Sequence, residues 1–123
     1  MTIVIHDGTV IFSNFTDGQV YILDLNSNGT PKRITSNTAH RFADFTVHPR
    51  YPRFVVCILE DHTYDQPSSV VSSLVVIDLQ STSPNPVTEL LSGADFYSNP
   101  RFNDDGIFLA WSQWDHPDMP WDG

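Results

Sequence analysis

The chain has 123 residues, with 15 Asp and Glu against 6 Lys and Arg and a formal net charge of −9. This length suits one domain, and a content of 40% hydrophobic and 17% charged residues excludes a disordered chain and a coiled coil. So acidic a chain is not expected to bind nucleic acid, and no apolar run is long enough to predict a membrane span. The first residues show no secretory signal, and the single cysteine, Cys57, leaves no internal disulfide. We therefore expect a soluble cytoplasmic domain.

Short apolar runs, rich in β-branched and aromatic residues, alternate along the chain with turn residues, and no window shows a helical period. The runs predict nine strands in chain order, at residues 9–15, 20–25, 32–36, 42–47, 54–59, 74–79, 87–91, 96–102 and 107–111. Turns such as Asp17-Gly18 and Asp105-Gly106 separate them. The predicted fold class is all-β.

The runs also repeat with a period near 50 residues. Tyr-Ile-Leu-Asp-Leu at 21–25 returns as Val-Val-Ile-Asp-Leu at 75–79, Ala-Asp-Phe at 43–45 returns at 94–96, and Glu-Asp-His at 60–62 is matched by Trp-Asp-His at 114–116. Four strands per repeat of this length are typical of a β-propeller blade. We therefore predict an incomplete β-propeller with about two four-stranded antiparallel blades. Residues 1–36 would hold strands B, C and D of one blade, 37–92 a complete blade, and 93–123 strands A and B of the next.

Three of the predicted strands, in residues 54–59, 74–77 and 107–111, are apolar at every position. Such strands need cover on both faces, which neighbouring blades supply in a propeller. Cys57, in the middle of one of them, is predicted to be a small core residue. Because propellers close with about four to eight blades, we expect apolar faces without partners at both ends, and a sequence that is part of a longer protein.

The segment 96–123 is the most distinctive part of the chain. In it a strand ending Leu-Ala-Trp runs into a His-Pro-Asp-Met-Pro-Trp-Asp loop. This pattern resembles a propeller blade of the prolyl oligopeptidase family of serine peptidases, in particular the dipeptidyl aminopeptidases and acylaminoacyl-peptidases. The residues that stand at the motif positions are Trp111, Trp114, His116, Pro117, Met119, Pro120, Trp121 and Asp122. One departure is Asn-Asp-Asp-Gly at 103–106, where the family usually has Ser-Pro-Asp-Gly.

The resemblance implies a two-domain enzyme in which an N-terminal propeller screens a C-terminal α/β-hydrolase domain and admits short peptides. That hydrolase domain is the implied partner, and a short peptide is the implied substrate. The catalytic serine would lie in a Gly-x-Ser-x-Gly turn, but the Ser92-Gly93 pair of this chain lacks the preceding glycine. We therefore expect no catalytic residue and no cofactor in this chain, which should not hydrolyse peptides by itself.

Two long loops, at residues 60–69 and 113–123, each follow a B strand and carry an Asp-His pair. Loops that join strands B and C in neighbouring blades are expected on the same face of a propeller. Their acidic side chains could attract the α-amino group of a peptide. The candidate substrate-facing residues are Glu60, Asp61, His62, Asp115 and His116. The alternative is that these acids are solvated turn residues.

Four side chains of the last loop are also of the type that binds metals: Asp115, His116, Asp118 and Asp122. Pro117 and Pro120 are expected to hold this loop extended, and the spacing fits neither a tetrahedral site nor an EF-hand. We therefore predict no metal site, but a rigid loop with its tryptophans packed down.

Two other kinds of protein stay open as alternatives. One is a non-enzymatic propeller that binds proteins, and the other is a small β-sandwich binding module. The 50-residue repeat argues against the sandwich, and a Gly-x-Ser-x-Gly reading frame downstream of codon 123 would favour the peptidase.

Overall fold

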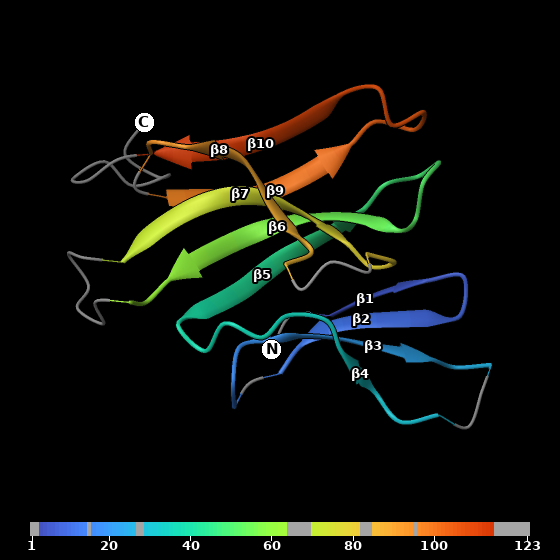
Figure 1. The fold of residues 1–123 in the computed structure, drawn as a ribbon. Coiled ribbons are helices and arrows are strands. Elements are labelled where there is room, and N and C mark those ends of the chain that lie inside the picture. The colour runs from blue at the N-terminus through green and yellow to red at the C-terminus, as the bar shows by residue number, and fades with distance from the viewer. Residues whose placement is uncertain are drawn as a thin grey trace.

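A computed structural model describes residues 3–14, 16–26, 29–63, 70–81, 85–94 and 96–114. These residues form strands joined by turns and no helix, which confirms the all-β class (Figure 1). The strands are β1 (Ile3–His6), β2 (Thr9–Ser13), β3 (Val20–Asp24), β4 (Lys32–Arg33), β5 (His40–Val47), β6 (Phe54–Asp61), β7 (Val71–Asp78), β8 (Val87–Ser92), β9 (Phe96–Phe102) and β10 (Leu109–Trp114). Nothing in this described part is a helix long and apolar enough to cross a membrane.

The strands belong to three antiparallel sheets, which follow one another in the molecule (Figure 1). The first sheet has the order β1-β2-β3-β4, the middle sheet has the order β5-β6-β7-β8, and β9 and β10 form a hairpin. The prediction of about two four-stranded antiparallel blades is therefore confirmed. Three sheets in series also differ from the two-sheet sandwich that the sequence left open.

Strand β1 corrects the prediction for residues 1–36, where three strands were expected and four are found. Asp7 and Gly8 both have positive φ, at 47° and 77°, and His6 pairs with Thr9 across them. This is the geometry of a two-residue hairpin turn, and Asp-Gly is its usual sequence. The Asp-Gly turn was visible in the sequence, but only four residues precede it in the strand, too few to show an alternating pattern.

The middle sheet contributes to two separate cores because its long strands are apolar on both faces. Toward the first sheet, β6 and β7 present Val55, Cys57, Leu59, Val75 and Ile77, which pack with Ile11, Val20, Phe42 and Phe45. Toward the hairpin they present Val56, Ile58 and Leu74, which pack with Tyr97. The predicted two-sided cover of residues 54–59 and 74–77 is confirmed, and so is the burial of Cys57.

A β-bulge recurs in the strands β5 and β9. The register shifts between Ala43 and Thr46 in one pair and between Ala110 and Ser112 in the other, and Asp44 and Asn99 have positive φ of 57° and 52°. The two bulges touch, because the Asn99 amide lies 3.4 Å from Asp44 Oδ2. The structural equivalent of Asp44 is thus 55 positions further on, which corrects the spacing expected from Ala-Asp-Phe at 94–96.

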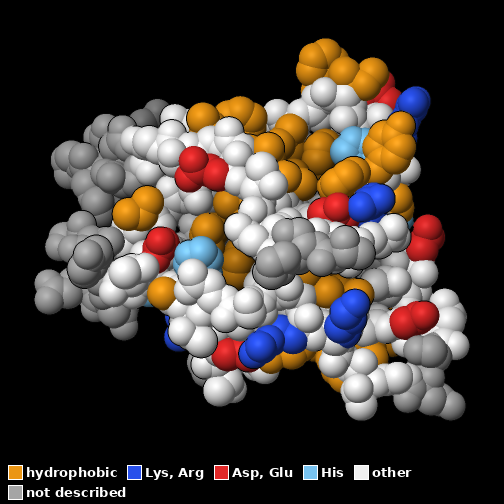
Figure 2. Space-filling model, in the orientation of Figure 1, with side chains coloured by type: hydrophobic (Ala, Val, Ile, Leu, Met, Phe, Trp, Pro, Cys, Tyr) orange, Lys and Arg blue, Asp and Glu red, His pale blue; other side chains and the backbone are white. Residues whose placement is uncertain are grey.

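Apolar side chains are exposed at both ends of the series of sheets. Ile3 and Ile5 are 56% and 62% exposed on the outer face of the first sheet, while Ile107 and Phe108 are both 70% exposed. Figure 2 shows hydrophobic side chains projecting over the tip of the β9–β10 hairpin. The predicted strand at 107–111 needs one correction, since it begins at Leu109. Its uncovered face agrees with the apolar face without a partner that was expected at this end.

Candidate functional site

The candidate residues Glu60 and Asp61 are the last two residues of β6, and Trp114 is the last residue of β10. Figure 1 shows the arrowheads of β6 and β10 on the same side of the molecule. This is the arrangement expected of two loops that join strands B and C. Asp115, His116 and the motif positions Pro117, Met119, Pro120, Trp121 and Asp122 lie outside the described residues, as does Asp118 of the weighed metal cluster.

Glu60 lies in contact with a histidine two positions further on. Its Oε1 is 3.1 Å from Nε2 of His62, and half of the Glu60 side chain is exposed. In the sheet, Glu60 is paired with Arg41 of β5. The carboxylate is therefore held at the sheet end and still reaches solvent.

Asp61 is bound more firmly than Glu60. Its Oδ1 accepts hydrogen bonds from the hydroxyl of Thr63 at 2.5 Å and from the Thr63 amide at 2.9 Å. The Thr63 hydroxyl, followed by its amide and by the nearby His40 and His62, lowers the pKa of Asp61 below its usual value. Asp61 is therefore ionised at neutral pH.

His40 belongs to this group of side chains, although the sequence did not single it out. It is the first residue of β5 and pairs directly with Asp61, so that its Nε2 lies 3.7 Å from Asp61 Oδ2. The predicted strand began two residues later, at 42. Extending the β5–β6 hairpin by two residues would have placed His40 opposite Asp61.

Neither a family profile nor a curated protein matches this chain. Solved structures do. Puromycin hydrolase matches 94% of the chain at 30% identity with a TM-score of 0.80, and a point variant of puromycin hydrolase in complex with PGG matches 92% with the same score. A puromycin-hydrolysing peptidase of Mycobacterium tuberculosis matches 98% at 29% identity with a TM-score of 0.76. The chain spans about a fifth of these structures, at 18% to 19% of their length.

The resemblance to the prolyl oligopeptidase family is confirmed. The sheets of this chain correspond to a portion of the propeller in such a peptidase, and each four-stranded sheet is one blade.

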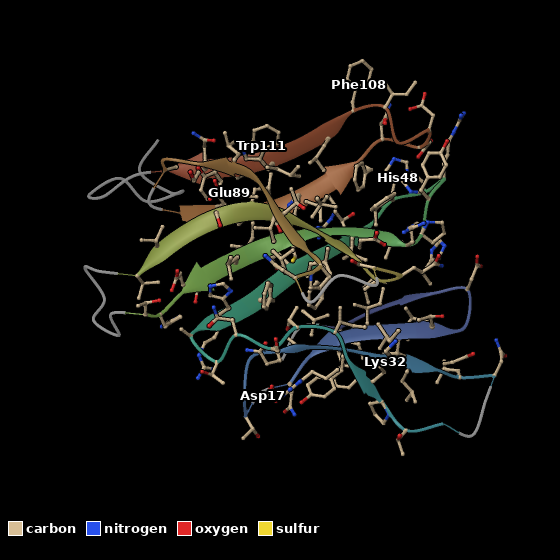
Figure 3. The ribbon with its side chains drawn as sticks, viewed as in Figure 1. Asp17, Lys32, His48, Glu89, Phe108 and Trp111 are labelled. Atoms are coloured by element: carbon tan, nitrogen blue, oxygen red, sulfur yellow. The ribbon has the colours of Figure 1, made fainter. Side chains whose placement is uncertain are left out.

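In this propeller portion the motif residue Trp111 lies on the open face of the last hairpin. Its indole Nε1 donates a hydrogen bond to Gln113 Oε1 at 3.0 Å, and 40% of the residue is exposed. Figure 3 shows Trp111 and Phe108 pointing away from the middle blade. Trp111 is thus a surface residue of the described part of the propeller.

In the described part of the chain, the end of β6 carries charged side chains, and the one cysteine, Cys57, is buried in the middle of that strand. Burial raises the pKa of the Cys57 thiol, and the Asp44 carboxylate raises it further, so this thiol is inert. Among the described residues, no group of three or more His, Cys, Asp and Glu side chains could hold a metal ion. What these side chains can do is present oriented negative charge to a cationic group.

Proposed function

We propose that this chain is part of the substrate-gating propeller of a serine peptidase of the prolyl oligopeptidase family, and that it is not catalytic by itself. The observation that carries the proposal is the match of 94% of the chain to part of puromycin hydrolase, at a TM-score of 0.80. In the parent protein, the propeller would let short peptides reach a C-terminal α/β-hydrolase domain and keep folded proteins out. The parent would be cytoplasmic and of aminopeptidase type.

Within this function, Glu60 and Asp61 would line the propeller face that turns toward the hydrolase domain. Both acids stand at the end of β6, and the exposed half of Glu60 is open to an approaching ligand. A carboxylate that binds a protonated α-amino group would hold the amino end of a short peptide in place. The hypothesis extends to Asp115, at the corresponding place after β10.

The test compares two matched substrates in the full-length enzyme, one with a free α-amino group and the same peptide N-acetylated. We expect Glu60→Gln to lower kcat/KM for the free-amine peptide by roughly ten- to a hundredfold, the size of a lost hydrogen bond to a charged group. The N-acetylated peptide should be affected far less. Glu89→Gln is the control, since Glu89 is an exposed acid on the outer strand β8. Equal kinetics of Glu60→Gln and the unaltered enzyme would contradict amine capture.

The assignment to a peptidase has its own test. The reading frame that continues past codon 123 should encode a Gly-x-Ser-x-Gly turn, followed by Asp and then His. The longer protein should then hydrolyse aminoacyl substrates such as puromycin, while residues 1–123 alone should not. A longer frame without that turn would favour the non-enzymatic propeller.

A further inference from the structure

Gln19 is a polar residue at the centre of the contact between the first blade and the start of the middle blade. It ends the turn between β2 and β3, and only 1% of it is exposed. Buried amides are tolerated when their hydrogen bonds are complete. Oε1 of Gln19 accepts a hydrogen bond from the Thr35 hydroxyl at 2.7 Å, and the Thr35 oxygen in turn accepts the amide of Val20 at 3.0 Å.

The other end of the Gln19 amide holds the turn that begins the middle blade. Nε2 donates to the backbone oxygen of Asn37 at 2.7 Å and to that of His40 at 2.9 Å. It also lies 3.3 Å from the backbone oxygen of Asp17 in its own turn. Gln19 thereby fixes both ends of the turn at residues 37–40 from the neighbouring blade.

This turn is the element to which the candidate site is attached. The backbone oxygen of Ala39 accepts the amide of His62 at 2.7 Å, and the ring of His62 contacts Glu60. The ring of His40 lies against Asp61. Each acid at the end of β6 therefore has a histidine ring beside it, and each histidine is joined through its backbone to the turn that Gln19 holds.

We propose that Gln19 is a positioning residue for the acids Glu60 and Asp61, acting from the first blade on a site in the middle blade. The proposal rests on the proposed capture of a peptide α-amino group by these acids. Gln19 touches neither acid directly. Its effect passes through the backbone of residues 37–40 and then through the two histidine rings.

The variant that tests this is Gln19→Met in the full-length enzyme, because Met fills a similar volume and has no amide. The measured quantity is the ratio of kcat/KM for the free-amine peptide to that for its N-acetylated form. We expect this ratio to fall by roughly tenfold, since small displacements of a positioning group have large effects. The amide of His62 should also exchange its hydrogen faster, because its acceptor at Ala39 moves.

Val20→Ala serves as the control. Val20 is fully buried in the same inter-blade core, but its apolar side chain can form no hydrogen bond with the turn at 37–40. It should reduce stability and leave the substrate ratio unchanged. If Gln19→Met does not fold, Thr35→Val is the second variant. It removes the hydrogen bond to Gln19 Oε1 and the one from the Val20 amide, and it leaves the Nε2 hydrogen bonds to residues 37 and 40 in place. A smaller fall in the ratio is therefore expected.

The outcomes separate the two proposals. If Glu60→Gln lowers the ratio and neither Gln19→Met nor Thr35→Val does, Gln19 only stabilises the contact between the blades, and amine capture stands. The same conclusion follows if Val20→Ala lowers the ratio as much as Gln19→Met. If Glu60→Gln leaves the ratio unchanged, amine capture fails, and the role of Gln19 fails with it.

Discussion

The acids at the end of β6 show how a few neighbours set the state of a side chain. Asp61 is surrounded by donors from Thr63 and by the ring of His40, whereas Glu60 has His62 beside it and keeps half of its surface in solvent. Asp61 is thus the more tightly held of the two carboxylates, and Glu60 is the more exposed. The two adjacent carboxylates differ because their local partners differ.

The Thr63 hydroxyl is the largest cause of the low pKa of Asp61, so Thr63→Val should raise that pKa toward its usual value. A carboxylate with a depressed folded pKa stabilises the fold above its unfolded pKa, and that stability is lost as the pH falls through the folded pKa. The unaltered chain should therefore be more stable than the variant at pH 6, and the difference should vanish in acid. Carboxyl-carbon NMR titration and urea unfolding measure both effects. Thr88→Val, on exposed β8, is the control, and an unchanged titration of Asp61 in Thr63→Val would contradict the assignment.

Gly106 illustrates a different constraint at the residue scale. It has a φ of 78°, and a Cβ added there would collide with the ring of His48, which packs against Phe102 with ring centroids 4.8 Å apart. Gly106→Ala should destabilise the protein by about 1–3 kcal/mol more than Gly93→Ala. Gly93 also has a positive φ, 116°, but open space around it, so its variant tests a positive φ without a collision. Equal urea midpoints of the two variants would show that the His48 ring can move aside without lowering the free energy of unfolding.

At the scale of elements, the strands β6 and β7 hold the sheets together because each contributes buried side chains to both hydrophobic cores. Ile77 is fully buried in the core that faces the first blade, whereas Leu90 on β8 is 48% exposed. The middle blade thus joins the other sheets, and its outer strand contributes little apolar packing.

Ile77→Ala should accordingly cost about 2–5 kcal/mol of unfolding free energy, through lost burial and the cavity left behind. Leu90→Ala should cost about 0.5 kcal/mol or less. Urea denaturation measures the loss of unfolding free energy in both variants. A small effect of Ile77→Ala would mean that the first blade does not close over the middle one in solution.

The sequence predicts strands well where apolar runs are long, and it predicts least where a contact joins distant segments. The two-sided strands at 54–59 and 74–77 are visible because no polar residue interrupts them. Gln19 looks like an ordinary turn residue, and its burial depends on Asn37 and His40 from the next blade. The bulge at Asn99 is likewise hidden, since only its backbone angle and its pairing reveal it. In the candidate site, the sequence repeat indicates Glu60, Asp61 and His62. His40 can be recognised only from the pairing of β5 with β6, which places it opposite Asp61.

At the scale of the whole molecule, the described blades form a series that is apolar at both ends. Ile3 and Ile5 mark one end, and Ile107 and Phe108 mark the other. Sheet faces of this kind attract further sheets, as the two inter-blade cores already show.

The isolated chain should therefore associate with itself and bind a hydrophobic dye. Phe108→Asp should reduce both, because it places a charge in the most exposed part of the apolar hairpin tip. Leu90→Asp, on the edge strand β8, should change them less. Light scattering after size-exclusion chromatography measures the association. A monomeric unaltered chain with little dye binding would contradict the expectation.

The order of strands within each sheet has one more consequence. Every described strand pairs only with strands that are adjacent to it in the chain, from β1 with β2 to β9 with β10. None of the sheets in the described part of the chain needs a distant segment before it can form, so the loop-closure cost of folding them stays small. Each blade can form as soon as its last strand has left the ribosome. The following blade can then pack against its apolar face. The protein can in this way fold in the order of its synthesis, with each new blade covering the exposed apolar face of the blade before it.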